Sequence, residues 1–382
     1  MKKVAVMGLI DWINYGEQFL GNTVSYLVGT DYDIKSIDFR PKKNKCRYLV
    51  YYFTVILAKI LAFWKKSHCV VLFGIKCLAK RYYEEQLKDC DSIIFACGSY
   101  KYGTQKLWAY YSVVIEVAQK LNIPVMFNAM NIQDFKEDDW RCKCLKKYTN
   151  YQCVKVFTTR DGEYGLNKLR TDYLEKDTPI YSDAVGDPAF WIPECYGVKR
   201  MNEGNKVGVN LIRGGVFEDY GLHITEQQLL EIYCQLIRKL ETEQIDWEMF
   251  TNGLEVDLDF GKAVLQRCGM SERKIVVPKS AQDLVERIAG YKGVIGARLH
   301  ACICAYSLDV PVVGFIWDEK MLRFAQISDL EENFLKEEEL SGEALYETLR
   351  DLLDKSYNKE LRDIWKQKTK VSIEQFLTQY MG

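Results

Sequence analysis

Several residue types and patterns that mark special classes of protein are scarce in this 382-residue sequence. It contains only 7 prolines and 25 glycines, which excludes collagen-like and low-complexity chains. Its 52 Lys and Arg residues balance 53 Asp and Glu residues, for a formal net charge of −1. A chain without a basic surplus has no general attraction for a polyanion, so we predict no nucleic acid partner.

Signals for metal binding and for disulfides are also weak. The 13 cysteines are odd in number and scattered, no Cys-x-x-Cys pair occurs, and only three histidines are present. The N-terminal residues lack the long apolar core and the small-residue cleavage site of a signal peptide. We therefore predict reduced thiols, no structural metal site and a cytoplasmic location.

One long apolar run tests that location. Tyr48 to Trp64 spans 17 largely apolar residues, with Lys59 inside it and basic residues on either side. A membrane-spanning helix needs about 20 apolar residues, and a central Lys opposes insertion by roughly 2.5–3.5 kcal/mol. We therefore predict a helix that packs on a sheet. The alternative is a peripheral contact of residues 45–66 with the anionic inner face of a membrane.

Short apolar runs alternate with longer helical patterns along the chain, which indicates βα units and mostly parallel sheets. The fold class is therefore α/β, with two doubly wound Rossmann-like domains that face each other across a cleft. The predicted domains are residues 1–195 and 206–340, followed by closing helices in 341–382. Ligands of such folds bind at the carboxyl ends of the strands. We predict strands at residues 3–7, 34–38, 92–96, 125–128, 155–158, 206–212, 246–251, 274–277, 293–295 and 312–315.

Common nucleotide-binding and nucleophile motifs are missing or incomplete. No Gly-x-Gly-x-x-Gly follows a strand, and no Gly-x-Ser-x-Gly occurs. Gly98 and Gly103 have the spacing of a P-loop, but Thr104 stands where the phosphate-binding Lys should be. Asp257-Leu258-Asp259 is similar to an Asp-x-Asp motif, and we interpret it as the polar start of a helix. These features argue against a dehydrogenase and an ATPase.

The most informative segment is Gly296-Ala297-Arg298-Leu299-His300-Ala301, which ends a predicted strand and opens a predicted helix. Amide groups at a helix start attract anions, a guanidinium binds phosphate or carboxylate, and an imidazole transfers protons near neutral pH. Lys320 follows the next strand on the same rim. We expect an anionic ligand at Arg298 and His300. The alternative is that Arg298 pairs with a structural Asp while His300 caps the helix.

This segment and its surroundings resemble the polysaccharide pyruvyl transferase family. The Gly-x-Arg-Leu-His-Ala motif is followed by a helix of small apolar residues, by Pro311-Val312-Val313 and by a Trp-Asp-x-Lys rim ending at Lys320. The family's upstream motifs are matched, in order, by Asn14-Tyr15-Gly16-Glu17, Ala96-Cys97-Gly98-Ser99, Arg160-Asp161, Asp187-Pro188-Ala189 and the strand at 207–213. Glu17 stands for the family's Asp, Cys97 for a Gly, and Glu163-Tyr164 for a Ser, all on loops of the first domain.

The resemblance implies transfer of pyruvate from phosphoenolpyruvate to sugar hydroxyls as a cyclic ketal, in the biosynthesis of a surface polysaccharide such as a capsule. Phosphoenolpyruvate is then a co-substrate, no cofactor is needed, and the acceptor is a sugar or a lipid-linked oligosaccharide. The resemblance places the donor in the second domain at Arg213, Arg298, Leu299, Lys320 and Asn210, with His300 as the proton-transfer residue and Arg298 as its catalytic companion. It places the acceptor on first-domain loops at Asn14, Gly16, Glu17, Gly98, Ser99, Arg160 and Asp161, where Glu17 or Asp161 would be the base.

Two alternatives remain open. One is a nucleotide-sugar-dependent glycosyltransferase of the same two-lobed architecture, because Arg and Lys at the rim of the second domain would equally hold a diphosphate. The other is a non-catalytic protein of a glycan-assembly complex, which the altered loops of the first domain permit.

Overall fold

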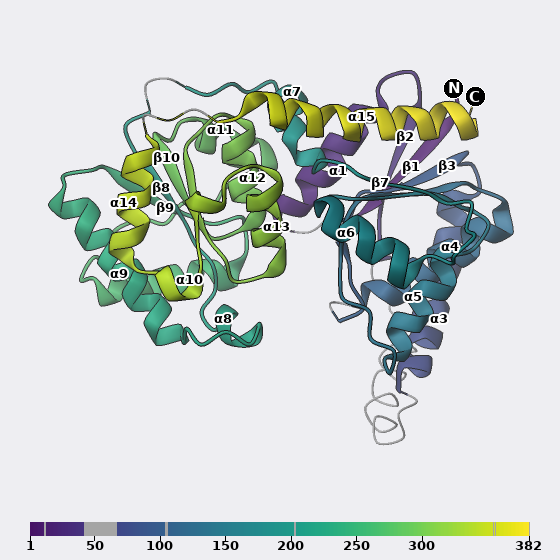
Figure 1. Cartoon of the computed structure of the whole chain (residues 1–382), viewed down its shortest axis with the longest axis horizontal. Coiled ribbons are helices and arrows are strands. Elements are labelled where there is room, and N and C mark those ends of the chain that lie inside the picture. The colour runs from purple at the N-terminus through teal and green to yellow at the C-terminus, as the bar shows by residue number, and fades with distance from the viewer. Residues whose placement is uncertain are drawn as a thin grey trace. The chain divides into compact units, whose positions relative to one another are not determined.

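The computed structural model describes residues 1–10, 13–41, 67–103, 106–201, 204–353, 355 and 357–381 (Figure 1). The predicted helix at Tyr48 to Trp64, and the segment 45–66 around it, lie outside the described residues. The chain forms two compact units. The first comprises Met1–Asp11, Val24–Asp187 and Gln367–Gly382, and the second comprises Trp12–Thr23 and Pro188–Lys366.

The first unit is built on a parallel sheet that has seven strands in the described part of the chain. The strand order is β2-β1-β3-β5-β6-β7, and the short β4 also pairs with β5. All five strands predicted for the first half of the chain are present in this sheet. The strands are β1 (Lys3–Gly8), β2 (Asp33–Asp38), β3 (Ser92–Phe95), β4 (Ser99–Tyr100), β5 (Val125–Ile132), β6 (Val154–Thr159) and β7 (Tyr181–Ala184).

A ladder of aromatic rings forms the centre of this unit. Phe95, Phe127 and Phe157 are paired in register on β3, β5 and β6, so their side chains emerge on the same face of the sheet. The ring centroids are 4.6 Å apart at both steps, and all three residues are fully buried. The unit's helices are α3 (Ser67–Leu87), α4 (Leu107–Leu121), α5 (Trp140–Thr149), α6 (Gly162–Lys168) and the π-helical turn η2 (Leu169–Tyr173).

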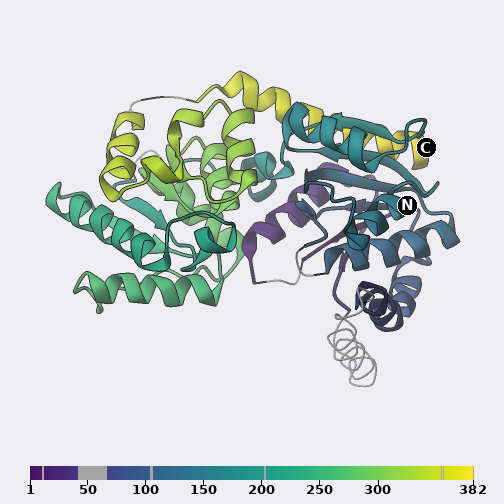
Figure 2. The same cartoon turned by 60° about the horizontal axis from the view of Figure 1, so that its bottom comes forward.

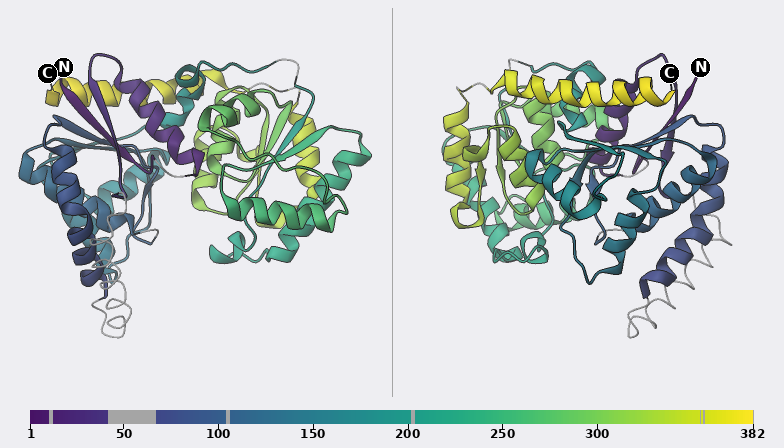
Figure 3. Two further views of the ribbon diagram at one scale, coloured as in Figure 1. Left: turned by 180° about the vertical axis from the view of Figure 1, so that it is seen from behind. Right: turned by 45° about the vertical axis from the view of Figure 1, so that its right-hand side comes forward.

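The end of the chain also belongs to the first unit. From Gln367 on, helix α15 (Lys359–Met381) groups with it, and Ile373, Phe376 and Leu377 are buried there. The two ends of the chain lie side by side (Figures 1 and 3), and the Lys2 ammonium donates a hydrogen bond to the carbonyl of Met381.

The second unit has a five-stranded parallel sheet in the described residues, in the order β12-β11-β10-β8-β9. Its strands are β8 (Val207–Asn210), β9 (Trp247–Phe250), β10 (Gly293–Gly296), β11 (Val312–Phe315) and β12 (Phe334–Leu335). The segment 274–277, predicted as a strand, makes a single bridge between Val276 and Phe250, so that prediction is wrong.

Helices cover both faces of this second sheet (Figures 1 and 2). Helix α9 contacts α10 and α14, and helix α12 contacts α11 and α13. Thr225 begins α9 with a capping box closed by Gln228. The bounds are α7 (Ile192–Tyr196), α8 (Val216–Asp219), α9 (Glu226–Thr242), α10 (Glu255–Arg267), α11 (Ala281–Ala289), α12 (Leu299–Ser307), α13 (Glu319–Ile327) and α14 (Gly342–Leu352).

The two parallel sheets confirm the predicted α/β class with two Rossmann-like units. The compact units differ from the predicted domains in three places. Residues 188–195 group with the second unit, residues 367–382 group with the first, and the first half of α1 (Tyr15–Val28) groups with the second. That half of α1 inserts Phe19 and Leu20 into the hydrophobic core of the second unit. None of the helices within the described residues has the length and apolar character needed to cross a bilayer.

Candidate active site

The predicted donor residues come together at the carboxyl edge of the second sheet. Strands β11, β10 and β8 are direct neighbours, and the segments that follow them carry Lys320, Arg298 and Arg213. Because the sheet is parallel, all three segments leave it at the same edge.

Arg298 is held in place by a buried carboxylate. It is the N-cap residue of α12, and its backbone N–H donates to Asn210 Oδ1 at 2.9 Å. Its guanidinium donates through Nε to Asp257 Oδ2 at 3.0 Å and through Nη2 to Asp257 Oδ1. The Asp257 side chain is 0% exposed, whereas that of Arg298 is 18% exposed. The alternative in which Arg298 pairs with an Asp is therefore realised, yet the Arg298 side chain keeps some exposed surface.

Asp257 also organises the neighbouring loop. It lies in the first turn of α10, as interpreted from the sequence, and its Oδ1 accepts a hydrogen bond from the backbone N–H of Arg213 at 2.9 Å. Burial raises the pKa of this carboxyl, while the guanidinium of Arg298 and the amide of Arg213 act in the opposite direction. Asp257 thus ties the segments after β8 and β10 to the helix that follows β9.

His300 lies in the first turn of α12, beside Arg298, and is 8% exposed. It does not occupy the N-cap position, which belongs to Arg298. The start of α1 packs against its imidazole: a Cβ atom placed on Gly16 would lie 2.5 Å from Nδ1 of His300 and 2.8 Å from its Cβ. A glycine at position 16 is therefore required for His300 to keep this position.

The segment Ile13 to Glu17 is attached to the rest of the second unit through Tyr15. The N–H of Tyr15 donates to the carbonyl of Asn252 at 3.1 Å, and its hydroxyl donates to the carbonyl of Pro278 at 3.0 Å. Gly253, at φ +97°, leaves no room for a side chain beside the Ile13 carbonyl. Asn14, Gly16 and Glu17, predicted on loops of the first domain, belong to the second unit together with His300.

The other two cations each have an acidic partner. The Nη2 of Arg213 donates to Asp219, and Lys320 Nζ lies 3.2 Å from Asp318 Oδ2 and 4.6 Å from the centre of the Trp317 ring. Asp318 is almost fully buried, but the Asp219 side chain is 59% exposed. A solvent-exposed ion pair contributes little free energy to stability. An anionic ligand can therefore replace Asp219 on Arg213 with only a small loss of free energy.

Tyr220 lies beside these charged side chains. Its ring packs edge-on against Trp317, with centroids 5.1 Å apart. Burial and the nearby Asp318 carboxylate raise its pKa to about 12, while Arg213 and Arg298 act in the opposite direction. The phenol therefore stays protonated at neutral pH, as a hydrogen-bond donor next to the two guanidiniums.

Two residues predicted to bind the donor are buried inside the second unit. Leu299 is 5% exposed and belongs to the hydrophobic core. Asn210 is fully buried: its Oδ1 accepts from the Arg298 amide, and its Nδ2 donates to Asn252 Oδ1 at 3.0 Å. Both side chains therefore set the position of the Arg298–His300 turn from inside the unit.

The first-unit residues predicted for the acceptor form a closed network. Arg160, which is buried, pairs with buried Asp187 and donates through Nη2 to the carbonyl of Gly98 at 3.0 Å. Asp161 accepts hydrogen bonds from Asn131 Nδ2 at 3.0 Å and from the N–H of Ile132 at 2.7 Å. The carbonyl of Ser99 accepts from the hydroxyl of Tyr111. These contacts join the loops at the carboxyl ends of the first sheet.

Sequence reasoning missed Asp219 and Tyr220 and recognised Asp257 only as part of a helix start. The available signal was positional: Asp257 opens the helix after β9, so it lies at the same carboxyl edge as Arg213 and Arg298. No cluster of three or more His, Cys, Asp or Glu side chains suited to a metal ion occurs among the residues that the structure describes.

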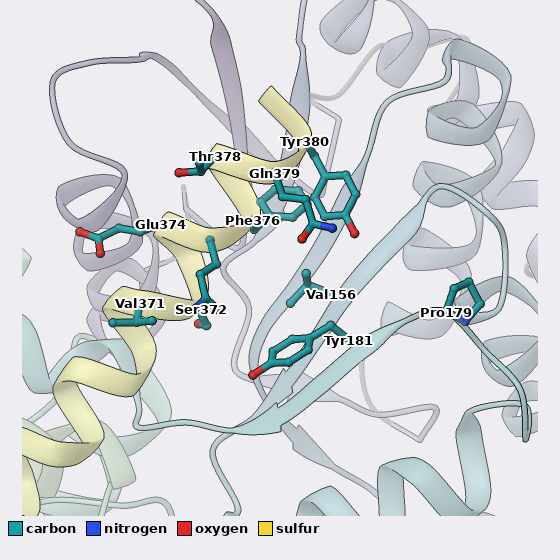
Figure 4. Close-up of a pocket in the computed structure, with 11 residues that line it drawn as sticks. Val156, Pro179, Tyr181, Val371, Ser372, Glu374, Phe376, Thr378, Gln379 and Tyr380 are labelled. Carbon is teal, nitrogen blue, oxygen red and sulfur yellow. The ribbon is translucent and has the colours of Figure 1, made fainter. Parts of the chain in front are cut away.

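Two cavities lie apart from this cluster. One, of about 610 Å³, is in the first unit between α15 and strands β6 and β7, where Tyr181 and Tyr380 line it (Figure 4). The other, of about 600 Å³, is in the second unit and is lined by residues 329–333, Leu352, Lys355, Tyr357 and Asn358. Neither lining includes a site residue predicted from the sequence.

Similar solved structures define the class of fold. They include a UDP-N-acetylglucosamine 2-epimerase (TM-score 0.58, 12% identity, covering 100% of this chain and 96% of that one). The Neisseria meningitidis UDP-GlcNAc 2-epimerase bound to UDP-GlcNAc has a TM-score of 0.56 at 11% identity, over 99% and 100% of the two chains. The Methanocaldococcus jannaschii enzyme in complex with UDP-GlcNAc and UDP has a TM-score of 0.55 at 12% identity, over 99% of each. At such low identity the likeness shows the fold alone.

The family follows from a sequence comparison. A family model described as polysaccharide pyruvyl transferase matches residues 14–319. This is well over half of the chain, so the chain belongs to the polysaccharide pyruvyl transferase family, as the resemblance predicted. No curated protein sequence matches it.

Gly16→Ala should displace the His300 imidazole, because the added methyl group would overlap Nδ1. The chain has three histidines, so their imidazole resonances can be resolved by NMR. We expect the His300 signals to move while those of exposed His223, which pairs with Glu337, stay in place. Gly103→Ala is the control, since its new Cβ would lie no closer than 3.4 Å to Gln133. Unchanged His300 resonances in Gly16→Ala would show that Gly16 does not pack against the His300 imidazole.

Arg160→Ala should destabilise the first unit, because it removes the guanidinium that balances the charge of the buried Asp187 carboxylate. The expected loss is about 3–5 kcal/mol in the free energy of unfolding. Arg81→Ala, which breaks an exposed helical pair with Glu85, should cost less than about 1 kcal/mol. Urea unfolding of both variants measures the difference. Equal losses in the free energy of unfolding for the two variants would contradict a structural role for Arg160.

Proposed function

We propose that this protein transfers pyruvate from phosphoenolpyruvate to two hydroxyls of a sugar, forming a cyclic ketal and releasing phosphate. The single observation that supports this most is the gathering of Arg298, Arg213 and His300 at one sheet edge, with Arg298 oriented by Asp257. Phosphoenolpyruvate carries a phosphate and a carboxylate, and two guanidiniums match both groups in geometry and charge.

The donor is bound at the start of α12 in this proposal. The helix is nine residues long, and its N-terminal amides favour an anion. The partly exposed Arg298 side chain adds a positive charge there. Arg213 exchanges Asp219 for an oxygen of the donor, and Lys320 adds a third positive charge from the rim.

His300 transfers the proton that starts the reaction. Protonation of the methylene carbon of phosphoenolpyruvate turns CH2 into CH3 and leaves a carbocation that its ester oxygen stabilises. A sugar hydroxyl attacks this carbon and loses its proton. Phosphate then departs, and the second hydroxyl attacks the same carbon and loses its proton to close the ketal. An imidazole has the pKa range to give and take these protons near neutral pH.

Glu17 is the better of the two candidate bases. It lies one residue after Gly16, which packs against His300, so it belongs to the same unit as the proposed donor site. Asp161 already accepts hydrogen bonds from Asn131 and Ile132 in a buried network. A carboxylate with its lone pairs engaged in this way is a poor acceptor for a further proton.

The acceptor is a sugar or a lipid-linked oligosaccharide of a surface polysaccharide such as a capsule, in this proposal. Phosphoenolpyruvate supplies both the transferred carbon unit and the leaving group, so the reaction needs no redox cofactor and no nucleotide. A cytoplasmic location, with residues 45–66 at the inner face of the membrane, would bring the protein to a lipid-linked acceptor. Those residues lie outside the described part of the chain.

The experiment is mass spectrometry of a glycan pool after incubation with the protein and phosphoenolpyruvate. The expected product is heavier than its acceptor by one pyruvate less one water. His300→Ala should lower phosphate release at least about 100-fold, since it removes the proton donor. His223→Ala is the matched control, because that imidazole is exposed and pairs only with Glu337 among its described contacts. A UDP-sugar consumed in place of phosphoenolpyruvate would favour the glycosyltransferase, and no turnover of either would favour the non-catalytic role.

Arg213→Ala and Asp219→Asn should change the affinity for phosphoenolpyruvate in opposite directions. Loss of the guanidinium removes a charge-assisted hydrogen bond and should weaken binding about 10–100-fold. Loss of the Asp219 charge removes a competitor for Arg213 and should strengthen binding by a few-fold. Isothermal titration calorimetry measures both. Unchanged affinity in both variants would take Arg213 out of the donor site.

A further inference from the structure

Two cysteines from different helices meet on the second unit. Cys234 lies on α9, and Cys268 is the C-cap residue of α10. The thiol of Cys268 donates to the sulfur of Cys234, with the two sulfur atoms 2.9 Å apart. Both are free thiols. A disulfide bond is about 2.05 Å long, so the sulfur atoms need to approach by only roughly 0.9 Å to form one.

The packing of the two helices keeps this pair together. Tyr233, next to Cys234, packs edge-on against Phe260 of α10, with ring centroids 5.8 Å apart. The thiol of Cys234 points at the carbonyl of Val264 on α10, 3.8 Å away. The contact between the sulfur atoms is therefore part of a larger helix–helix interface.

The two thiols differ in access. Cys234 is fully buried, whereas Cys268 is partly exposed. Burial, together with the neighbouring Cys268, raises the pKa of Cys234 to about 12. An oxidant from solution therefore reaches Cys268 first, and Cys234 is placed to react with the product.

We propose that Cys234 and Cys268 are a reversible modification site, which a peroxide converts into a disulfide that joins α9 to α10. Hydrogen peroxide oxidises the Cys268 thiol to a sulfenic acid and is reduced to water. The Cys234 sulfur then attacks the sulfenic sulfur, the S–S bond forms, and the sulfenic oxygen leaves as a second water with the proton of Cys234. A dithiol reductant reverses the modification.

The disulfide would link the two helices that support the cluster at the sheet edge. Asp257, on α10, binds Arg298 and Arg213, and Tyr233, on α9, donates its hydroxyl to the carbonyl of Asn210 at 2.9 Å. Because the sulfur atoms are already in contact, the bond should leave this arrangement intact. It should also stabilise the unit, since it closes a long loop of chain from residue 234 to residue 268.

The test is to treat the full chain with hydrogen peroxide and to map the products by peptide mass spectrometry. The expected product is a peptide pair linked through Cys234 and Cys268, lighter by two hydrogens and separated by dithiothreitol. The melting temperature should rise by about 5 °C or more on oxidation and return on reduction. Neither readout depends on the proposed pyruvyl transfer.

Variants separate this pair from the other thiols. Cys234→Ser should abolish the link and leave Cys268 as a sulfenic acid that dimedone traps, and Cys268→Ser at the partly exposed position should abolish both products. Cys195→Ser, which removes another partly buried thiol of the same unit, should leave the link unchanged. Oxidation of Cys268 to sulfinic or sulfonic acid without a link, a link to a different cysteine, or an unchanged melting temperature would overturn the proposal.

Discussion

The carboxyl edge of the second unit depends on one buried ion pair. Asp257 has no exposed surface, and an isolated charge in that position would cost several kcal/mol, so its carboxylate and the guanidinium of Arg298 have to stay together. Because Asp257 also accepts from the Arg213 amide, the pair joins three chain segments that follow β8, β9 and β10. Without this pair, the three segments would lose the contact that fixes their positions relative to one another.

Local sequence patterns predict most of the strands but not which residues meet in space. Buried strands such as β10 and β11 are short apolar runs, and the Arg298–His300 turn directly follows β10. Asp257 is 41 residues from Arg298 and Gly16 is far from His300, so no local pattern indicates that they meet. The apolar segment at 274–277 looks like a strand, yet only Val276 pairs with the sheet. Hydrophobic periodicity shows that a segment has a face to bury. Which element that face packs against depends on the rest of the fold.

The motif residues of the two units have different roles although they are of the same types. Arg160 and Asp187 form a pair that is buried on both sides, with Gly98 as a further acceptor, which is how a structural link between loops is built. Arg298 and Arg213 also pair with carboxylates, but both side chains are partly exposed. Exposure, which a sequence motif does not encode, therefore separates the residues that can meet a ligand from those that hold the loops in place.

The acidic partners of the three cations bear on how such a site would turn over. Arg298, Arg213 and Lys320 are each matched by an Asp, so the cluster is close to neutral before any ligand arrives. In the proposed reaction phosphate is part of the donor and is also the product, and an unbalanced cationic pocket would hold both tightly. Asp257 and Asp318 are buried and stay with their partners, whereas Asp219 is exposed and can move away. Exchange at Arg213 alone would then admit the donor, and the return of Asp219 to Arg213 would favour release of the phosphate.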